Sequence, residues 1–72
     1  NSEKASFVQA RSRLRFGLLL RKERKSESAI TQFLLASEIL KKLVDAYPGE
    51  AVYRRYLDQV LQILAAENQV ER

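Results

Sequence analysis

Apolar residues recur at intervals of three and four in three stretches of the chain, and two short segments interrupt the pattern. This spacing puts apolar side chains on one face of an α-helix, which turns once in about 3.6 residues. The pattern predicts helices over about residues 3–23, 27–46 and 50–67. In the first helix we expect an apolar face of Phe7, Ala10, Leu14, Gly17 and Leu18, widened by Phe16, Leu19 and Leu20.

The second stretch alternates small and large apolar residues along its main line. Small residues let a neighbouring helix approach closely, and large ones fill the space on either side. This line is Ala29, Phe33, Ala36, Leu40, Leu43 and Tyr47, broadened by Ile30, Leu34, Ile39 and Val44. The third helix has two adjacent lines, Val52, Tyr56, Val60 and Ile63, and Tyr53, Leu57, Leu61 and Leu64.

The two interruptions carry different turn chemistry. Residues 24–28 are polar, and we expect Ser26 or Ser28 to cap the second helix by accepting from its free N–H groups. Pro48 ends that helix because it lacks an N–H, and Gly49 is expected to allow the reversal. Short connections favour antiparallel neighbours. The predicted fold class is all-α, an antiparallel helical hairpin plus one helix, in a single domain over residues 1–72.

Composition removes several classes of protein. Two Gly and one Pro are too few for a multi-stranded β domain, and an apolar run of about 18 residues, which a membrane span needs, is absent. With no Cys and no His, the chain cannot form a disulfide, a thiolate zinc site or a Ser–His pair. We expect no enzyme activity, no cofactor and no metal. Because the chain begins with Asn1, we expect a fragment of a larger protein, for which we favour the cytoplasm.

Positive charge is concentrated in the first third of the chain. The net charge is +4, made of 8 − 2 = +6 in residues 1–25 and 5 − 7 = −2 in residues 26–72. Lys4, Arg11, Arg15 and Lys22 are spaced 7, 4 and 7, which places them on one helical face. This face is either an ordinary solvated surface or a docking surface for an acidic partner.

The chain also compares with itself at an offset of 41, which aligns Phe16 with Leu57 and Leu20 with Leu61. In addition, Gly17, Ala29, Phe33 and Ala36 are separated by 12, 4 and 3 residues, and Pro48 follows. These residues resemble a tetratricopeptide repeat over about residues 10–64. The resemblance implies that the second helix crosses the first at the small residue.

Several positions depart from the usual repeat. Arg13 stands where Trp or Tyr opens the first helix, and Leu20 stands where Tyr is common. Pro48 lies seven residues beyond its place in the form of about 34 residues, so the longer variety of roughly 42 residues is the better match. Asp58 replaces the small residue of a partial second repeat, which suits a terminal helix that no further helix crosses. A second resemblance is to microtubule-interacting-and-transport domains, through the Ala-aromatic-Ala pattern and the run Tyr56-Leu57-Asp58.

The tetratricopeptide resemblance implies a protein-interaction scaffold whose first helices line a peptide groove. Arg suits carboxylates because its planar fork makes paired hydrogen bonds, so we expect an acidic and apolar protein or peptide partner. The second resemblance implies a partner that is a short helical peptide. The candidate partner-binding residues are Arg11, Leu14, Arg15, Leu18, Arg21, Lys22, Arg55, Gln59 and Gln62.

The sequence also bears on nucleic acid and on a second copy of the chain as partners. We disfavour nucleic acid because no recognition motif is evident, and because Tyr47, Tyr53 and Tyr56 suit packing or an interface. Leu19 or Leu20, Leu35 and Ile63 cannot all be buried in a unit of this size. Exposed together, they would need a neighbour, which is either the next repeat of a longer protein or a second copy of the chain. We expect a homo-oligomer formed by stacking of equivalent faces.

Overall fold

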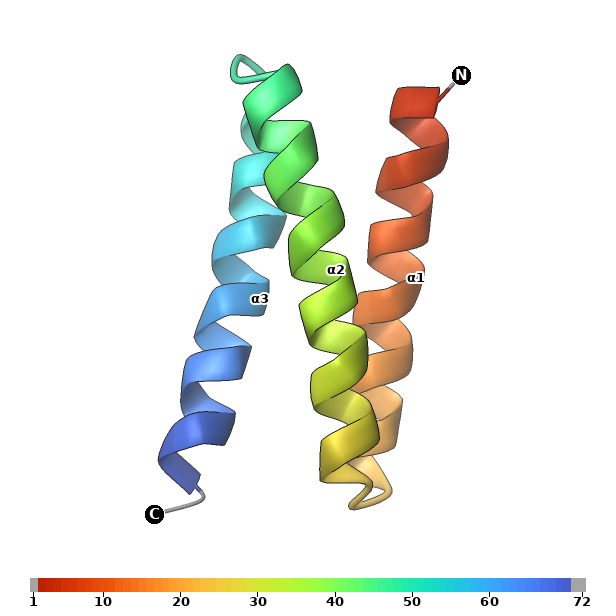
Figure 1. Cartoon of the computed structure of the whole chain (residues 1–72), viewed down its shortest axis with the longest axis vertical. Helices are drawn as coiled ribbons and strands as arrows, with labels where there is room; N and C mark the ends of the chain where they lie inside the picture. Colours follow the sequence, from red (N-terminus) through yellow and green to blue (C-terminus); the bar gives the residue numbers. More distant parts are fainter. Residues whose placement is uncertain (1, 71–72) are drawn as a thin grey trace.

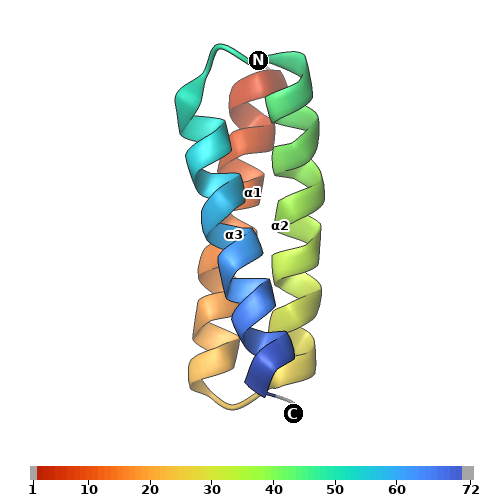
Figure 2. The same cartoon turned by 90° about the vertical axis from the view of Figure 1, so that its left-hand side faces the viewer.

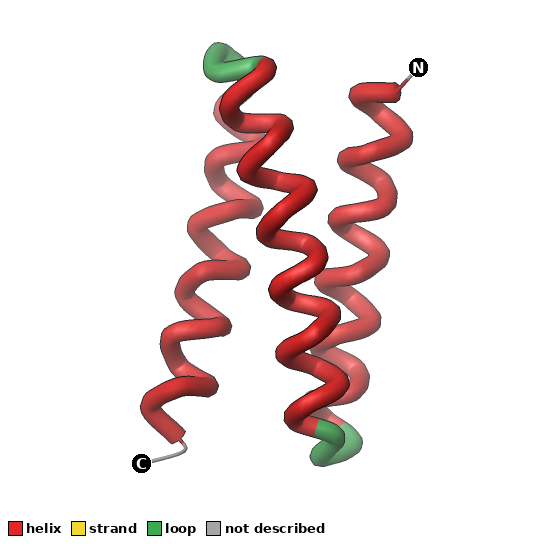
Figure 3. Tube along the Cα trace, viewed as in Figure 1, coloured by secondary structure: helices red, strands yellow, loops and turns green. Residues whose placement is uncertain are grey.

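The computed structural model describes residues 2–70, with side chains described through residue 67. It contains three helices, α1 (Ser2–Lys22), α2 (Ser26–Ala46) and α3 (Ala51–Val70), and confirms the all-α class (Figure 1). The predicted bounds agree within one residue, except that α3 continues to Val70 instead of ending near residue 67. Figure 3 shows the two short connections at opposite ends of the molecule.

The three helices run alternately up and down, so α1 and α3 point in the same direction (Figure 1). Figure 1 shows α2 between α3 and α1, and in the side view α3 lies in front of α1 with α2 to one side of both (Figure 2). The body measures 37 × 20 × 14 Å. Both outer helices pack on α2.

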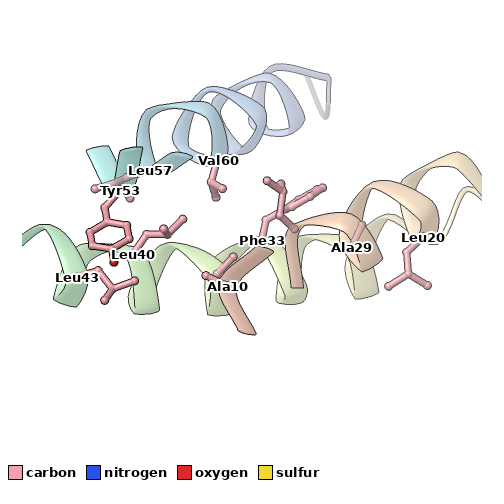
Figure 4. Close-up of a cluster of buried hydrophobic side chains, with 11 residues drawn as sticks. Ala10, Leu20, Ala29, Phe33, Leu40, Leu43, Tyr53, Leu57 and Val60 are labelled. Carbon is pink, nitrogen blue, oxygen red and sulfur yellow. The ribbon is translucent and has the colours of Figure 1, made fainter. Parts of the chain in front are cut away.

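The core is centred on α2. Phe33, Leu40 and Val60 are the largest side chains that are fully buried (Figure 4). Burial of such a side chain contributes about 1.5–3 kcal/mol, so this small centre contributes much of the stability of the fold. The other buried apolar residues are Ala10, Leu14, Leu20, Ala29, Ala36, Leu43, Tyr53 and Leu57. Ser37 is also buried, and its hydroxyl donates to the Leu34 carbonyl oxygen at 2.8 Å.

Helices α1 and α2 are in tight contact at Gly17, where the ring of Phe33 lies against the backbone of α1. A Cβ atom at Gly17 would lie 2.6 Å from Cε1 and 2.8 Å from Cδ1 of Phe33. These distances are shorter than van der Waals contact, so the ring of Phe33 occupies the space that a side chain at residue 17 would need. The resemblance noted above implies a small residue at this place.

Some predicted core residues lie on the surface. The exposed fraction is 47% for Phe16, 52% for Leu19, 48% for Leu34 and 41% for Leu61. Each lies at the edge of an apolar stripe, on the side that no other helix covers. Tyr47, predicted to end the main line of α2, forms its C-terminal boundary and is exposed as well.

The offset of 41 between the outer helices is wrong as a guide to equivalent positions. It aligns buried Leu20 with exposed Leu61, and exposed Leu19 with buried Val60. An offset of 43 instead aligns buried residues of α1 with buried residues of α3, namely Ala10 with Tyr53, Leu14 with Leu57 and Gly17 with Val60. At the offset of 43, Gly17 aligns with buried Val60 and no longer with Asp58, which is exposed.

The connection between α1 and α2 is closed by main-chain hydrogen bonds. The N–H of Lys25 donates to the Leu20 carbonyl oxygen at 2.9 Å, and that of Arg24 donates to the Arg21 carbonyl oxygen at 3.0 Å. This is a Schellman arrangement, whose left-handed position usually holds Gly. Here Arg24 occupies it with a φ of 66°.

Two predictions about the connections are wrong. Lys25, and neither Ser26 nor Ser28, is the N-cap of α2, and no side chain accepts from the free N–H groups there. Gly49 has no positive φ, so the second reversal does not depend on a glycine conformation. The N–H of Glu50 donates to the Tyr47 carbonyl oxygen at 3.0 Å and holds this turn instead.

Candidate functional site

A groove of about 370 Å³ lies between the two outer helices. Four of its lining residues come from α1 and two from α3, although no connection joins these helices directly. The lining residues are Arg11, Leu14, Arg15, Leu18, Tyr56 and Gln59. The packing of α1 and α3 on α2 therefore creates a single concave surface from distant parts of the sequence.

The α1 wall of the groove combines charge with apolar surface. Arg11 and Arg15 are one helical turn apart and exposed, whereas Leu14 is buried and Leu18 half-buried. The guanidinium carbon of Arg11 lies 5.5 Å from the centre of the Phe7 ring. A cation at this distance is attracted to the ring face, so Phe7 restrains the Arg11 side chain beside the groove.

Aromatic rings join the outer helices at one end of the groove. The Phe7 ring lies 5.1 Å from that of Tyr53 at 60°, and 5.3 Å from that of Tyr56 at 82°. Tilted and edge-to-face pairs at these distances are favourable. Tyr56 therefore lines the groove and also packs on Phe7, the ring that Arg11 contacts.

A hydrogen bond also joins α1 and α3 at this end of the groove. The Tyr53 hydroxyl donates to Oε2 of Glu3 at 2.5 Å. This bond, with smaller contributions from burial and nearby acidic groups, raises the pKa of Tyr53 from 10.0 to about 12. The neutral phenol is favoured because only the neutral form can donate to the carboxylate.

An ion pair joins α1 and α3 near the other end of the bundle. A guanidinium nitrogen of Arg21 lies 3.7 Å from Oε1 of Glu67. The Arg21 side chain is thus directed to Glu67 and does not line the groove. The open part of the groove lies between this pair and the aromatic rings.

The structure brings together five of the nine predicted site residues. Arg11, Leu14, Arg15, Leu18 and Gln59 line the groove. The other four, Arg21, Lys22, Arg55 and Gln62, do not line this groove.

The difference on α3 comes from the rotation of this helix about its axis. Arg55 and Gln62 are exposed, but the side of α3 that faces α1 carries Tyr56 and Gln59, with half-buried Ile63 one turn further. The sequence reasoning missed Tyr56 as a groove residue. The spacing of 3 and 4 between these three residues was the signal that could have identified it.

The groove is electropositive. Its lining contains two guanidinium groups, one amide and one phenol, and no carboxylate. Among the described residues, the ion pairs involve Arg21, Lys25 and Arg54, and neither Arg11 nor Arg15. Such a surface can offer forked hydrogen bonds to a carboxylate beside an apolar floor.

A second pocket of about 300 Å³ lies where the start of α1 meets the end of α2. Its lining is mixed and includes both Glu3 and Lys42, so it has no single charge character. Within residues 2–70 we find no group of acidic side chains arranged to hold a metal ion. None of the helices in this range has the combined length and apolarity that crossing a membrane requires.

Comparison with models of protein families gives no match, and neither does comparison with curated proteins or with solved structures.

Proposed function

We propose that the chain is a protein-interaction module whose α1–α3 groove binds a peptide segment carrying acidic and apolar side chains. The observation that carries this proposal is the placement of Arg11 and Arg15 along a groove with Leu14 at its floor. Carboxylates of the peptide would bind the two guanidinium groups, and an apolar side chain between them would contact Leu14 and Leu18.

The groove fits a binding role better than a catalytic one. Its polar groups are guanidinium, amide and phenol groups, which donate to a ligand, and its lining supplies no carboxylate or imidazole to act as a base. We therefore propose binding without a chemical step.

We propose a tetratricopeptide-like scaffold as the basis of this groove. The contact of Gly17 with Phe33 supports it, because the resemblance implies a small residue in the first helix where the second helix crosses. The groove between the outer helices also supports it, since the resemblance implies peptide binding on that side. A microtubule-interacting-and-transport-like module remains the second candidate, with a short helical peptide as its ligand.

Fluorescence anisotropy tests the proposal with defined probes. A labelled peptide of Glu and Leu with Ser spacers should bind, whereas its counterpart with Lys in place of Glu should not. A random-sequence DNA duplex distinguishes general attraction to phosphate, which weakens steeply with salt. Equal binding of the Glu and Lys peptides, or preferential binding of the duplex, would contradict the proposed function.

A further inference from the structure

The side of α1 opposite α2 carries a stripe of exposed residues, which we call the outer α1 stripe. Its members are spaced 4, 3, 4 and 3 and therefore lie on one helical face. They are Val8, Ser12, Arg15, Leu19 and Lys22. Val8 and Leu19 have exposed fractions of 56% and 52%, and the charged members are both basic. The stripe thus presents apolar surface within positive charge.

Helix α2 carries a second stripe of exposed residues, which we call the outer α2 stripe. Its members are spaced 4, 3, 4, 3 and 4. They are Glu27, Thr31, Leu34, Glu38, Lys41 and Asp45. Three carboxylates and one ammonium group give a net charge of −3 + 1 = −2. Leu34 supplies apolar surface near the middle, so this stripe is the electrostatic complement of the first.

The two stripes cannot meet within one chain. The buried residues of α1, which include Gly17 against Phe33, lie on the side opposite Val8 and Leu19. On α2, Gln32 accepts a hydrogen bond from Arg13 of α1 at 3.0 Å, and Leu34 lies about 200° further around the helix. Each stripe therefore points away from the helix that carries the other.

We propose that the outer α1 stripe of one chain binds the outer α2 stripe of a second copy. The outer α1 stripe covers residues 8–22 and the outer α2 stripe residues 27–45, so the two stripes are similar in length and opposite in charge. Leu19 would pack on Leu34 of the second copy, with Arg15 and Lys22 on either side of this contact and close to its carboxylates. Charge complementarity fixes which faces pair.

This assembly joins unlike faces. Pairing of two outer α1 stripes would bring basic residues together, and pairing of two outer α2 stripes would bring acidic residues together, both of which are unfavourable. A contact between unlike faces leaves one free stripe at each end, so it extends into longer assemblies unless it closes into a ring. Pairing of two equivalent outer stripes is therefore the less favourable arrangement.

Charge-exchange variants test the pairing. Ser12→Glu with Lys22→Glu makes the outer α1 stripe acidic, and Glu38→Lys with Asp45→Lys makes the outer α2 stripe basic. Arg15 stays unchanged because it also lines the groove. The matched control is Arg55→Glu, which reverses an exposed charge outside both stripes. Circular dichroism checks that every variant remains helical.

Sedimentation velocity from micromolar to millimolar concentration gives the readout. The unaltered chain and the Arg55→Glu control should form species heavier than 8.3 kDa as concentration rises. Each double variant alone should stay a monomer, and an equimolar mixture of the two should associate again.

Three results would overturn the inference. They are a monomer for the unaltered chain at all concentrations, association that the double variants do not alter, and failure of the mixture to associate. Peptide binding to the double variants, measured separately, reports on the groove. Failure of the assembly is thereby distinguished from failure of the proposed function.

Discussion

The ring of Phe33 fills the space beside Gly17 that a side chain at residue 17 would need. Phe33 has no exposed surface, and its ring lies where the Cβ of residue 17 would project. The Phe33 ring can therefore be fully buried at this place only because Gly17 has no side chain. This pair sets the distance between α1 and α2, and through it the position of the α1 wall of the groove.

Replacing Gly17 by Ala should destabilise the fold. The ring of Phe33 must move within a packed core, which costs about 1–3 kcal/mol. Helix propensity favours Ala by about 1 kcal/mol, so the expected net loss is about 0–2 kcal/mol in the free energy of unfolding. Urea denaturation followed by circular dichroism measures it.

The matched control is Gly49→Ala, because a Cβ at Gly49 would have no atom within 4 Å. Its φ is not positive, so Ala fits the backbone and restricts the unfolded chain. We expect no change, or a gain of about 0.4–1 kcal/mol. Equal effects of the two substitutions would show that contact with Phe33 does not govern residue 17.

Replacing Arg24 by Gly should stabilise the fold. Its φ of 66° lies in the left-handed region, which costs an L-residue about 1–2 kcal/mol. Arg24→Gly removes this strain but adds freedom to the unfolded chain, so we expect a net gain of about 0.5–1 kcal/mol. Lys22→Gly, in the last turn of α1, should instead be destabilising. Thermal unfolding of both variants checks the contrast.

The bond from Tyr53 to Glu3 predicts a loss of stability at high pH. The pKa of Tyr53 is about 12 in the folded chain, compared with the ordinary tyrosine value of 10.0. The folded chain holds the proton more tightly than the unfolded chain does. The resulting stabilisation is therefore complete below pH 10.0 and is lost as the pH rises towards about 12.

Spectroscopic titration of the tyrosines tests this difference. Glu3→Gln should return the pKa of Tyr53 towards its ordinary value, and Tyr53→Phe should remove the highest phenol titration from the spectrum. Tyr56→Phe should leave that titration in place, since Tyr53 is the residue that donates to Glu3. A Tyr53 that ionises close to pH 10.0 in the unaltered chain would disprove the assignment.

Arg11 and Arg55 serve as test and control for binding in the groove. Both are exposed arginines on the outer helices, but only Arg11 lines the groove and stacks on Phe7. Arg11→Gln should weaken binding of the Glu and Leu peptide about tenfold, equivalent to about 1.4 kcal/mol. Arg55→Gln should leave the dissociation constant unchanged. A larger effect at Arg55 would place the binding surface elsewhere on α3.

Much of the fold could be predicted from the sequence because its signals were local. Pro48 and the polar residues 24–28 marked the ends of helices, and the alternation of Ala with Phe33 and Leu40 marked the face of α2 that both neighbours contact. Such signals depend on backbone chemistry and helical spacing, which act within a few residues.

The details that failed depend on relations between distant segments. The rotation of α3 about its axis determines whether Arg55 or Tyr56 faces α1, and wide apolar stripes allow either. The surface position of Leu19 depends on which sides of α1 the other helices leave uncovered. Arg24 gave no signal of a left-handed residue, because Gly is the usual indicator of that conformation.

The most direct test of the central claim is an NMR titration of the isotope-labelled chain with the Glu and Leu peptide. We predict that the largest amide shifts occur on both walls of the groove, at Arg11, Leu14, Leu18, Tyr56 and Gln59. Amides of the outer α2 stripe should change little. Saturable binding with shifts confined to α2, or no shifts at peptide concentrations that saturate the anisotropy signal, would contradict the groove as the binding site.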